Sequence, residues 1–151
     1  MSELETNLPP ALQAQRVIVV HADLAERQEI GASKHGVRYV VPILGGRFEG
    51  PEALAGEVLP GGADWQLLRA DGVLEIDARY SLRAQDGALI HVRNRGIVVR
   101  PLASEPLYVR SVPELEVAST SAHAWLNRVI FLGTLQLLSR HKVCVAIYRV
   151  T

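Results

Sequence analysis

The sequence predicts an all-β fold: a single antiparallel β-barrel, lipocalin-like or a similar closed barrel, with about eight to ten strands and little helix. Three observations predict this fold. Turn signals built from Gly, Pro and Asp-Gly recur roughly every 8–12 residues, which is typical of barrels and sandwiches. The runs between them are rich in β-branched and apolar residues, and none has the amphipathic stripe of a long helix. A closed barrel is favoured because it leaves no strand edge exposed.

The clearest strands form a meander around two Asp-Gly pairs. Asp71-Gly72 and Asp86-Gly87 each separate two apolar-rich extended runs, which is the strongest short-range signal of a hairpin. They predict strands over residues 64–70, 73–83 and 88–99. The middle strand alternates with a period of two, with Leu74, Ile76, Ala78, Tyr80 and Leu82 on one face and Glu75, Asp77, Arg79, Ser81 and Arg83 on the other. The pattern allows either face to be the inside of the barrel.

The N-terminal half predicts a lead-in and then shorter strands. Residues 1–10 are polar and end in Pro9-Pro10, so we expect a flexible lead-in to a single barrel domain over residues 11–151. Pro42 indicates a strand edge or a bulge, and Gly45-Gly46 indicates a close backbone approach. The expected elements are strands over 17–20, 38–44 and 53–59, a loop or continued strand (alternatively a short helix) over 22–30, and a tight reversal at 60–62.

The C-terminal third predicts further extended chain. Residues 101–124 are expected in two extended pieces around Pro113, with a flexible tip at residues 119–121. Residues 126–138 are apolar nearly all round, as in a buried helix, but Gly133 and the β-branched residues favour a buried strand. The alternation over 143–150 predicts a closing strand.

The charge balance excludes some classes of partner. The chain carries 16 basic and 16 acidic residues, so no net charge draws it to nucleic acid or to an anionic membrane. No run approaches the roughly 18 apolar residues of a spanning helix, and the N-terminus lacks the apolar core of a signal peptide. Cys144 is the one cysteine, which fits a reducing compartment. We expect a cytoplasmic protein that, without net charge, assembles as a homo-oligomer.

The sequence contains no pattern that predicts a metal or a cofactor. The five histidines are scattered without HxH or HxxxH spacing and there is one cysteine, so no metal site is predicted. The segments GGRFEGP and LPGGADW lack both the spacing of a phosphate loop and a following helix, so no nucleotide cofactor is predicted.

Several ordered blocks carry a resemblance to a known family. The segments GGRFEGP, LPGGADWQLLRADG, LEIDARYSLRAQDGALIHVRNRG and AWLNRVIF resemble the signature blocks of the family called domain of unknown function 3237, found in bacteria and fungi. The resemblance extends from about Arg38 to Val150. It implies a compact β-barrel that is usually multimeric, and it implies no particular activity.

The resemblance also singles out individual positions. The chain departs from the family pattern at Leu115-Glu116-Val117, where the family usually has Phe-Glu-Thr. The positions that match are Gly45, Gly46, Phe48, Gly50, Pro51, Gly61, Gly62, Asp64, Trp65, Asp77, Arg79, Tyr80, Asn94, Arg110, Glu116, Trp125 and Asn127.

Asp64 and Arg79 are the candidate catalytic residues. Asp64 follows a Gly-Gly turn, and the neighbouring indole of Trp65 would desolvate the carboxylate and raise its pKa towards the range of a general base. Alternatively, Asp64 accepts backbone N–H bonds and fixes the turn. Arg79 would polarise a ligand carbonyl or bind a carboxylate with its two parallel donors, oriented by Asp77. Alternatively, Asp77 and Arg79 form a cross-strand ion pair on a solvated face.

The remaining candidates are ligand-binding residues. Arg93 and Asn94 face opposite ways on the next strand, so only one of them can join Arg79. Tyr80 lies on the apolar face, where it lines a site or packs in the core. Asn127 follows Trp125 at the entry to a long apolar run, and if buried it must hydrogen-bond to a loop or to a ligand.

Three functions follow from these residues. The first is an enzyme with acid/base isomerase, lyase or cyclase chemistry on a small organic molecule, bound in or at the mouth of the barrel. The second is a non-catalytic carrier of such a ligand. The third is a structural or partner-binding oligomer. A small-molecule site is favoured. If polar groups such as Asp77, Arg79 and Asn94 face inward, their burial is unfavourable, and a bound ligand would explain their presence there.

Overall fold

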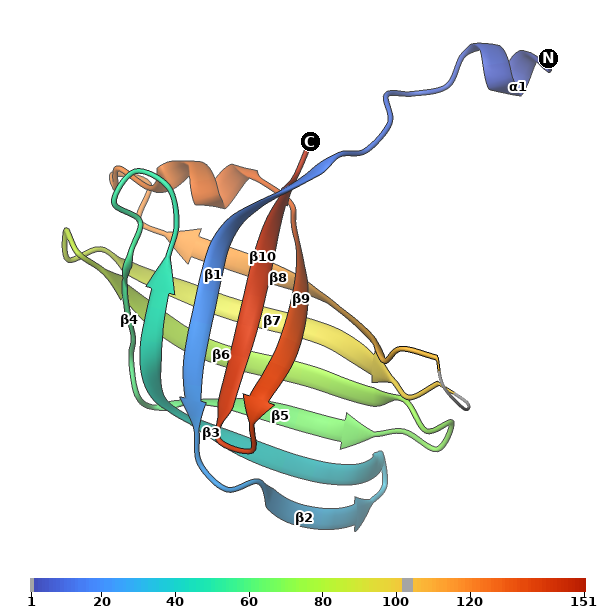
Figure 1. The fold of residues 1–151 in the computed structure, drawn as a ribbon, viewed down its shortest axis with the longest axis vertical. Coiled ribbons are helices and arrows are strands. Elements are labelled where there is room, and N and C mark those ends of the chain that lie inside the picture. Colours follow the sequence, from blue (N-terminus) through green and yellow to red (C-terminus); the bar gives the residue numbers. More distant parts are fainter. Residues whose placement is uncertain (1, 102–104) are drawn as a thin grey trace.

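A computed structural model of the chain describes residues 2–101 and 105–151. The described residues form ten strands, one four-residue helix and one short 3-10 helix (Figure 1). Their bounds are α1 Glu3–Thr6, β1 Ala14–Leu24, β2 Gln28–Ser33, β3 Gly36–Glu49, β4 Gly56–Val58, β5 Gly62–Leu68, β6 Leu74–Ala84, β7 Leu89–Val99, β8 Tyr108–Val117, η1 Ala124–Arg128, β9 Phe131–Ser139 and β10 Lys142–Val150. None of the helices described here has the length and apolar character needed to cross a membrane.

The strands form a closed antiparallel ring, as predicted. The sheet order runs β1-β10-β9-β8-β7-β6-β4-β3, with β5 also lying between β6 and β3. The ring closes because β1 pairs with β3 as well as with β10, with Val19 opposite Glu49 and Leu24 opposite Ile43. In Figure 1, β1, β10 and β9 run nearly vertically in front of the meander β5 to β8, whose strands lie closer to horizontal. The fold is therefore a β-barrel.

The long strand β3 pairs with different strands before and after a bend at Gly46. Its first part, from Val37 to Ile43, pairs with β5, and its second part pairs with β1 and β4. Gly46 has a φ of +138°, and a Cβ at this position would lie 2.0 Å from the His21 carbonyl oxygen. The predicted close backbone approach is thus confirmed, and it brings β3 against β1 where the barrel closes.

Pro42 lies where β3 changes partner. The residues before it, Gly36 to Val40, pair with β2, and pairing with β1 begins only at Ile43. Its carbonyl accepts the Ala25 N–H at 3.0 Å. On one side Pro42 pairs with Ala63 of β5. On the other side the pairs with β2 end at Val40 and those with β1 begin at Ile43, so Pro42 has a local strand edge there and its missing N–H leaves no ladder bond unmade. The predicted edge or bulge is confirmed.

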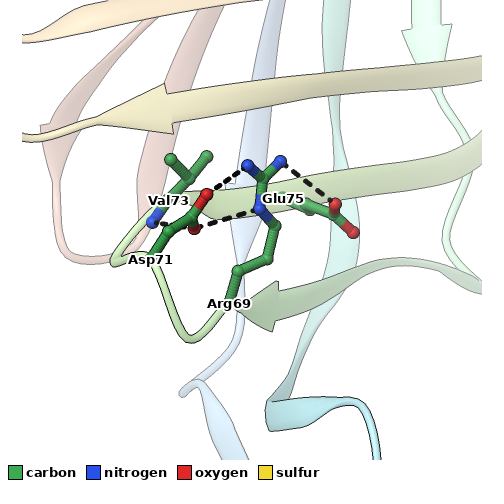
Figure 2. Close-up of polar contacts among 4 residues, drawn as sticks. All are labelled: Arg69, Asp71, Val73 and Glu75. Atoms are coloured by element: carbon green, nitrogen blue, oxygen red, sulfur yellow. Dashed lines mark hydrogen bonds and ion pairs between the residues drawn. The ribbon is translucent and has the colours of Figure 1, made fainter.

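Both Asp-Gly pairs form the predicted hairpin turns. At the first, the Gly72 N–H donates to the Arg69 carbonyl at 3.0 Å, and Gly72 adopts a φ of +86°. Figure 2 shows the Arg69 guanidinium holding both carboxylate oxygens of Asp71 and also reaching Glu75, while Asp71 accepts the Val73 N–H. The side chains therefore fix the same turn that the backbone sequence favours.

Two predictions for the C-terminal third are wrong. Residues 124–128 form the 3-10 helix η1, and the strand starts only at Phe131, because Leu126 turns into the end of the barrel, where it is 1% exposed. Pro113 does not divide its segment, since β8 runs from Tyr108 to Val117 through it. The only pair that joins β8 to β9 in the described chain is Ser111 opposite Gly133, so most of β8 has a partner on one side only and tolerates a proline.

The core fills one half of the barrel. Leu54, from the β3–β4 connection, and Leu126, from η1, are fully buried at the end of the barrel that these segments cover. Phe48 and Phe131 pack in the same cluster with residues of β1, β6, β7 and β10. Burying large apolar side chains contributes about 1.5–3 kcal/mol each to stability. The core continues into the other half of the barrel as the wall of a cavity, since Ile43, Tyr80 and Val145 belong to both.

Candidate binding cavity

The other half of the barrel contains a cavity of about 930 Å³. Strands β1, β3 and β5 to β10 all contribute to its wall. The β1–β2 connection, the β7–β8 connection and the β9–β10 turn border it at the end where β1, β7 and β9 finish. Most of the lining side chains are apolar, among them Val41, Ile43, Ile76, Val109, Leu135 and Val145. The size and the apolar wall are those of a site for a small organic molecule.

Asp64 points into this cavity from β5. Its Oδ1 accepts the backbone N–H of Asp77 at 2.9 Å, and its Oδ2 accepts from the side-chain amide of Gln66 at 2.9 Å. The pairing of β5 with β6 is interrupted between Asp64 and Leu67, so the carboxylate holds an amide that the strand ladder leaves free. Asp64 therefore accepts a backbone N–H, but from the neighbouring strand β6 rather than from the Gly-Gly turn that precedes it, and it also faces the cavity.

Burial raises the pKa of the Asp64 carboxyl above its usual value of 3.8. The hydrogen bonds from Gln66 and from the Asp77 backbone lower the pKa again in part, and the Asp77 carboxylate raises it. Desolvation is the largest of these effects, because it disfavours the charged form of a carboxyl in an apolar surrounding. A carboxyl with a raised pKa in a cavity is suited to accept and return a proton.

Tyr80 and Asn94 present further polar groups in the cavity wall. Tyr80 on β6 is 6% exposed and Asn94 on β7 is 2% exposed, and both line the cavity. The Tyr80 hydroxyl and the Asn94 Oδ1 are buried without a hydrogen-bond partner among the described residues. Burial, together with the charge of Asp64, raises the pKa of Tyr80, so its hydroxyl remains protonated and can donate. A buried polar group without a hydrogen bond lowers the stability of the fold by about 1–3 kcal/mol. The Tyr80 hydroxyl and the Asn94 Oδ1 are therefore both available to hydrogen-bond a group inside the cavity.

The raised pKa of Asp64 makes stability depend on pH. The folded protein binds this proton more tightly than the unfolded chain, so the stabilising contribution is present below pH 3.8 and is lost as the pH rises through the folded pKa. Asp64→Asn removes the titration. In urea unfolding at a series of pH values, we expect the wild-type free energy of unfolding to fall relative to that of Asp64→Asn as the pH rises above 3.8 and through the raised folded pKa.

Asp71 provides a control with the opposite sign. The hydrogen bond from Arg69 lowers the pKa of the Asp71 carboxyl, so its contribution is present above the unfolded pKa and is lost as the pH falls. The wild type should gain stability relative to Asp71→Asn as the pH rises. Parallel curves for the wild type and Asp64→Asn would contradict the raised pKa of Asp64.

The charged pair predicted on β6 lies outside the barrel. Asp77 accepts from Nε and Nη2 of Arg93, both at 3.2 Å, and the Arg79 Nε lies 3.9 Å from the Asp77 carboxylate. The Arg79 side chain is 52% exposed. Of Arg93 and Asn94, Arg93 therefore shares the face of Arg79, while Asn94 faces inward. The wall of the barrel separates Arg79 from the cavity, and the solvated ion pair is the arrangement that the structure shows.

The remaining candidates, Trp65, Trp125 and Asn127, all lie away from the cavity. Trp65 is 47% exposed on the outer face of β5, so the interior of the barrel, and not its indole, desolvates Asp64. Trp125 packs against Phe131 at the covered end, with ring centroids 6.1 Å apart. Asn127 donates to the Val117 carbonyl at 2.8 Å and accepts the Val117 N–H at 2.9 Å, which anchors η1 to β8. None of these three side chains borders the cavity.

Sequence reasoning missed several residues of the cavity. Gln66 shares the face of Asp64, and the period of two along β5 would have revealed it. Thr134 and Gln136 lie on β9, in a run that reads as uniformly apolar. Four arginines also border the cavity, at positions 27, 100, 110 and 140. In residues 2–101 and 105–151, no three His, Cys, Asp or Glu side chains gather closely enough to hold a metal ion.

Solved structures share this barrel. A conserved protein of unknown function from Rhodopseudomonas palustris is 31% identical and superposes with a TM-score of 0.84, covering 95% of this chain and 100% of that chain. A beta-barrel like protein from Acinetobacter baumannii is 30% identical, with a TM-score of 0.83 over 95% of this chain and 99% of that one. An enzyme from Penicillium herquei is 21% identical, with a TM-score of 0.75 over 96% of this chain and 98% of that one, and it shares the fold.

Sequence comparison agrees with the structures. A UPF0311 protein of Rhodopseudomonas palustris strain TIE-1 is 32% identical over 139 residues, which are 84% of this chain and 90% of the relative. A UPF0311 protein of Clostridium acetobutylicum is 35% identical over 109 residues, 64% of this chain and 68% of the relative. The profile of the family described as "Protein of unknown function (DUF3237)" matches residues 12–150. The chain therefore belongs to the DUF3237 family.

Proposed function

We propose that the protein binds a small organic molecule in the barrel cavity and that Asp64 exchanges protons with it, in chemistry of the isomerase, lyase or cyclase type. One observation carries the proposal. Asp64, Tyr80 and Asn94 converge in a cavity that is otherwise mostly apolar, and two of the three have a buried polar atom without a partner among the described residues. A ligand carbonyl oxygen would accept from the Tyr80 hydroxyl, and a ligand hydroxyl would donate to the Asn94 Oδ1.

The roles follow from the protonation states. Asp64, with its raised pKa, takes a proton from an acidic O–H or C–H of the ligand and returns it at another position. The Tyr80 hydroxyl stays protonated and donates to the oxygen on which negative charge develops. Asn94 fixes the orientation of the ligand through its unpaired amide oxygen. Arg79, outside the barrel, takes no part.

The relatives bear on this proposal only weakly. The Penicillium herquei protein is described as an enzyme, and at 21% identity it shares the fold with this chain. The support for catalysis by this chain is the group of Asp64, Tyr80 and Asn94 in its own cavity.

A non-catalytic carrier is the second candidate function. The observation that favours it is the hydrogen bonding of Asp64, whose two oxygens already hold the Asp77 N–H and the Gln66 amide. In that case the cavity would bind the same class of ligand, and Asp64 would only fix the β5–β6 pairing. Proton transfer to the ligand separates the two functions.

Native mass spectrometry of the purified protein tests the binding step. We expect the wild type to retain a small organic molecule with a stoichiometry of one. Ala78→Phe, placed in the cavity wall opposite Asn94, would fill the cavity and abolish retention. Arg79→Gln, on the outer face, is the matched control and should retain the ligand. Binding that persists in Ala78→Phe would mean that the ligand lies elsewhere and would contradict the proposal.

A further inference from the structure

We infer that the ligand is an organic anion, with its charged group at the cavity mouth and an uncharged, mostly apolar body inside, and that Arg110 binds the charged group. The inference rests on the proposed function, because it names the class of molecule that the same cavity takes. Its evidence is the distribution of charge along the cavity, which the binding of a neutral ligand would not require.

Positive charge gathers at one end of the cavity. Arg27, Arg100, Arg110 and Arg140 border it, against Glu26 and Asp64 as the only lining acids among the described residues. The whole chain has equal numbers of acidic and basic residues, so this local excess is not a consequence of composition. Arg27 lies in the β1–β2 connection, Arg100 in the β7–β8 connection, Arg110 near the start of β8 and Arg140 in the β9–β10 turn. These segments all lie at the end of the barrel where the cavity opens.

Two of these arginines already have partners. Arg140 forms an ion pair with Glu26 at 2.7 Å, which neutralises both. The Arg27 guanidinium lies over the Tyr39 ring, with its Cζ 4.0 Å from the ring centroid. Their donors are thus partly committed to the protein itself.

Arg110 has no acidic partner within ion-pair distance in the described part of the chain. Its Nη1 donates to the Val109 carbonyl at 2.7 Å, and its Cζ lies 5.5 Å from the Tyr108 ring centroid. Arg110 is exposed and belongs to the outward-facing residues of β8, and its side chain borders the rim of the cavity. The next residue, Ser111, forms the one pair between β8 and β9 in the described chain, so β8 has no partner on that side at Arg110. A guanidinium has five donors, and those not used here can hold an anion with two parallel hydrogen bonds.

The depth of the cavity sets the orientation of the ligand. Asp64 would repel a second negative charge, and the surrounding wall of Val41, Ile43 and Ile76 would not solvate one. The anionic group is therefore stable only at the mouth. The uncharged end of the molecule reaches Asp64, Tyr80 and Asn94, where the proposed proton transfer takes place.

Two fluorescent probes with the same body test the inference. 1-Anilinonaphthalene-8-sulfonate carries a sulfonate that N-phenyl-1-naphthylamine lacks. We expect the wild type to bind the sulfonate more tightly than the neutral probe, and the difference to shrink as salt is raised. Arg110→Gln should weaken sulfonate binding about tenfold, the loss of a partly exposed charged hydrogen bond, and leave the neutral probe unchanged. Arg95→Gln, exposed on the outer face of β7, is the matched control and should change neither affinity.

The outcomes separate this inference from the proposed function. If both probes bind with equal affinity, Ala78→Phe blocks both, and Arg110→Gln changes neither, the cavity binds organic molecules and the anion site is wrong. An equal loss of both probes in Arg110→Gln would also overturn the inference, because Arg110 would then shape the cavity rather than bind the anion. If neither probe binds the wild type, the proposed function fails and the inference fails with it.

Discussion

Asp64→Asn is expected to lower proton exchange with the cavity ligand by about 10²–10⁴-fold, the usual contribution of a general acid or base. Binding should persist, because the asparagine oxygen can still accept the Asp77 N–H that orders the wall of the cavity. The measurement is deuterium incorporation, in heavy water, into the compound extracted from the wild-type protein, followed by mass spectrometry. Retention of the compound is measured in parallel, so that lost exchange is distinguished from lost binding.

Two variants define the meaning of that result. Tyr80→Phe removes only the hydroxyl that would donate to the developing charge, and we expect an intermediate loss of exchange. Arg79→Gln changes a charged side chain on the outer face of β6 and should leave exchange near the wild-type rate. Undiminished exchange in Asp64→Asn would exclude Asp64 as the acid/base and would favour the carrier function.

Gly46→Ala is expected to destabilise the fold by about 3 kcal/mol or more, which combines overpacking with a strained positive φ. The added Cβ would lie 2.0 Å from the His21 carbonyl oxygen and 3.0 Å from the Ala22 Cα, both of them backbone atoms of β1. Neither atom can move without opening the pairing between β1 and β3 that closes the barrel. Urea unfolding at neutral pH gives the change in the free energy of unfolding.

Gly87→Ala is the matched control for that prediction. Gly87 also has a positive φ, +87°, but a Cβ there would meet nothing within 4 Å. Its cost should be the backbone strain alone, about 1 kcal/mol. Equal losses of stability at the two positions would show that the close approach of β3 to β1 contributes nothing beyond backbone conformation.

The meander could be predicted from sequence because its signals are local. Each Asp-Gly pair supplies its own positive φ, and the Asp71 side chain supplies its own turn hydrogen bonds. The alternation along β6 separates the inward Tyr80 from the outward Asp77 over a run long enough to exclude chance. The predicted strands at 64–70, 73–83 and 88–99 correspond to Gly62–Leu68, Leu74–Ala84 and Leu89–Val99.

The candidate site was only partly predictable, because a period of two does not say which face is inside. Asp77 and Arg79 appeared costly if they faced inward, but both lie on the outer face, where the Asp77 carboxylate pairs with Arg93 and with Arg79. No neighbouring residue in the sequence marks Asp64 as inward or outward. Its inward position depends on the register in which β5 pairs with β3 and β6. Register between distant strands is set by packing, which a single sequence does not reveal.

Two further features depend on contacts between distant parts of the chain. Residues 124–128 form η1 because this turn buries the Leu126 side chain in the core at the covered end of the barrel, a tertiary contact that the local apolar run does not show. Arg110 matches a position of the family pattern, but no sequence signal places it at a cavity. Its place at the cavity is created by the course of β8 relative to β9, whose residues follow about 20 positions later.

The single pair between β8 and β9 makes the barrel unevenly stiff. On one side of it the meander is held by continuous ladders, ten residue pairs between β6 and β7 and ten between β7 and β8. Across this seam one pair, Ser111 with Gly133, completes the ring. Thermal fluctuations open a structure first where the fewest hydrogen bonds must break together. The ring therefore yields at this seam, beside the cavity, while the covered half of the barrel remains closed.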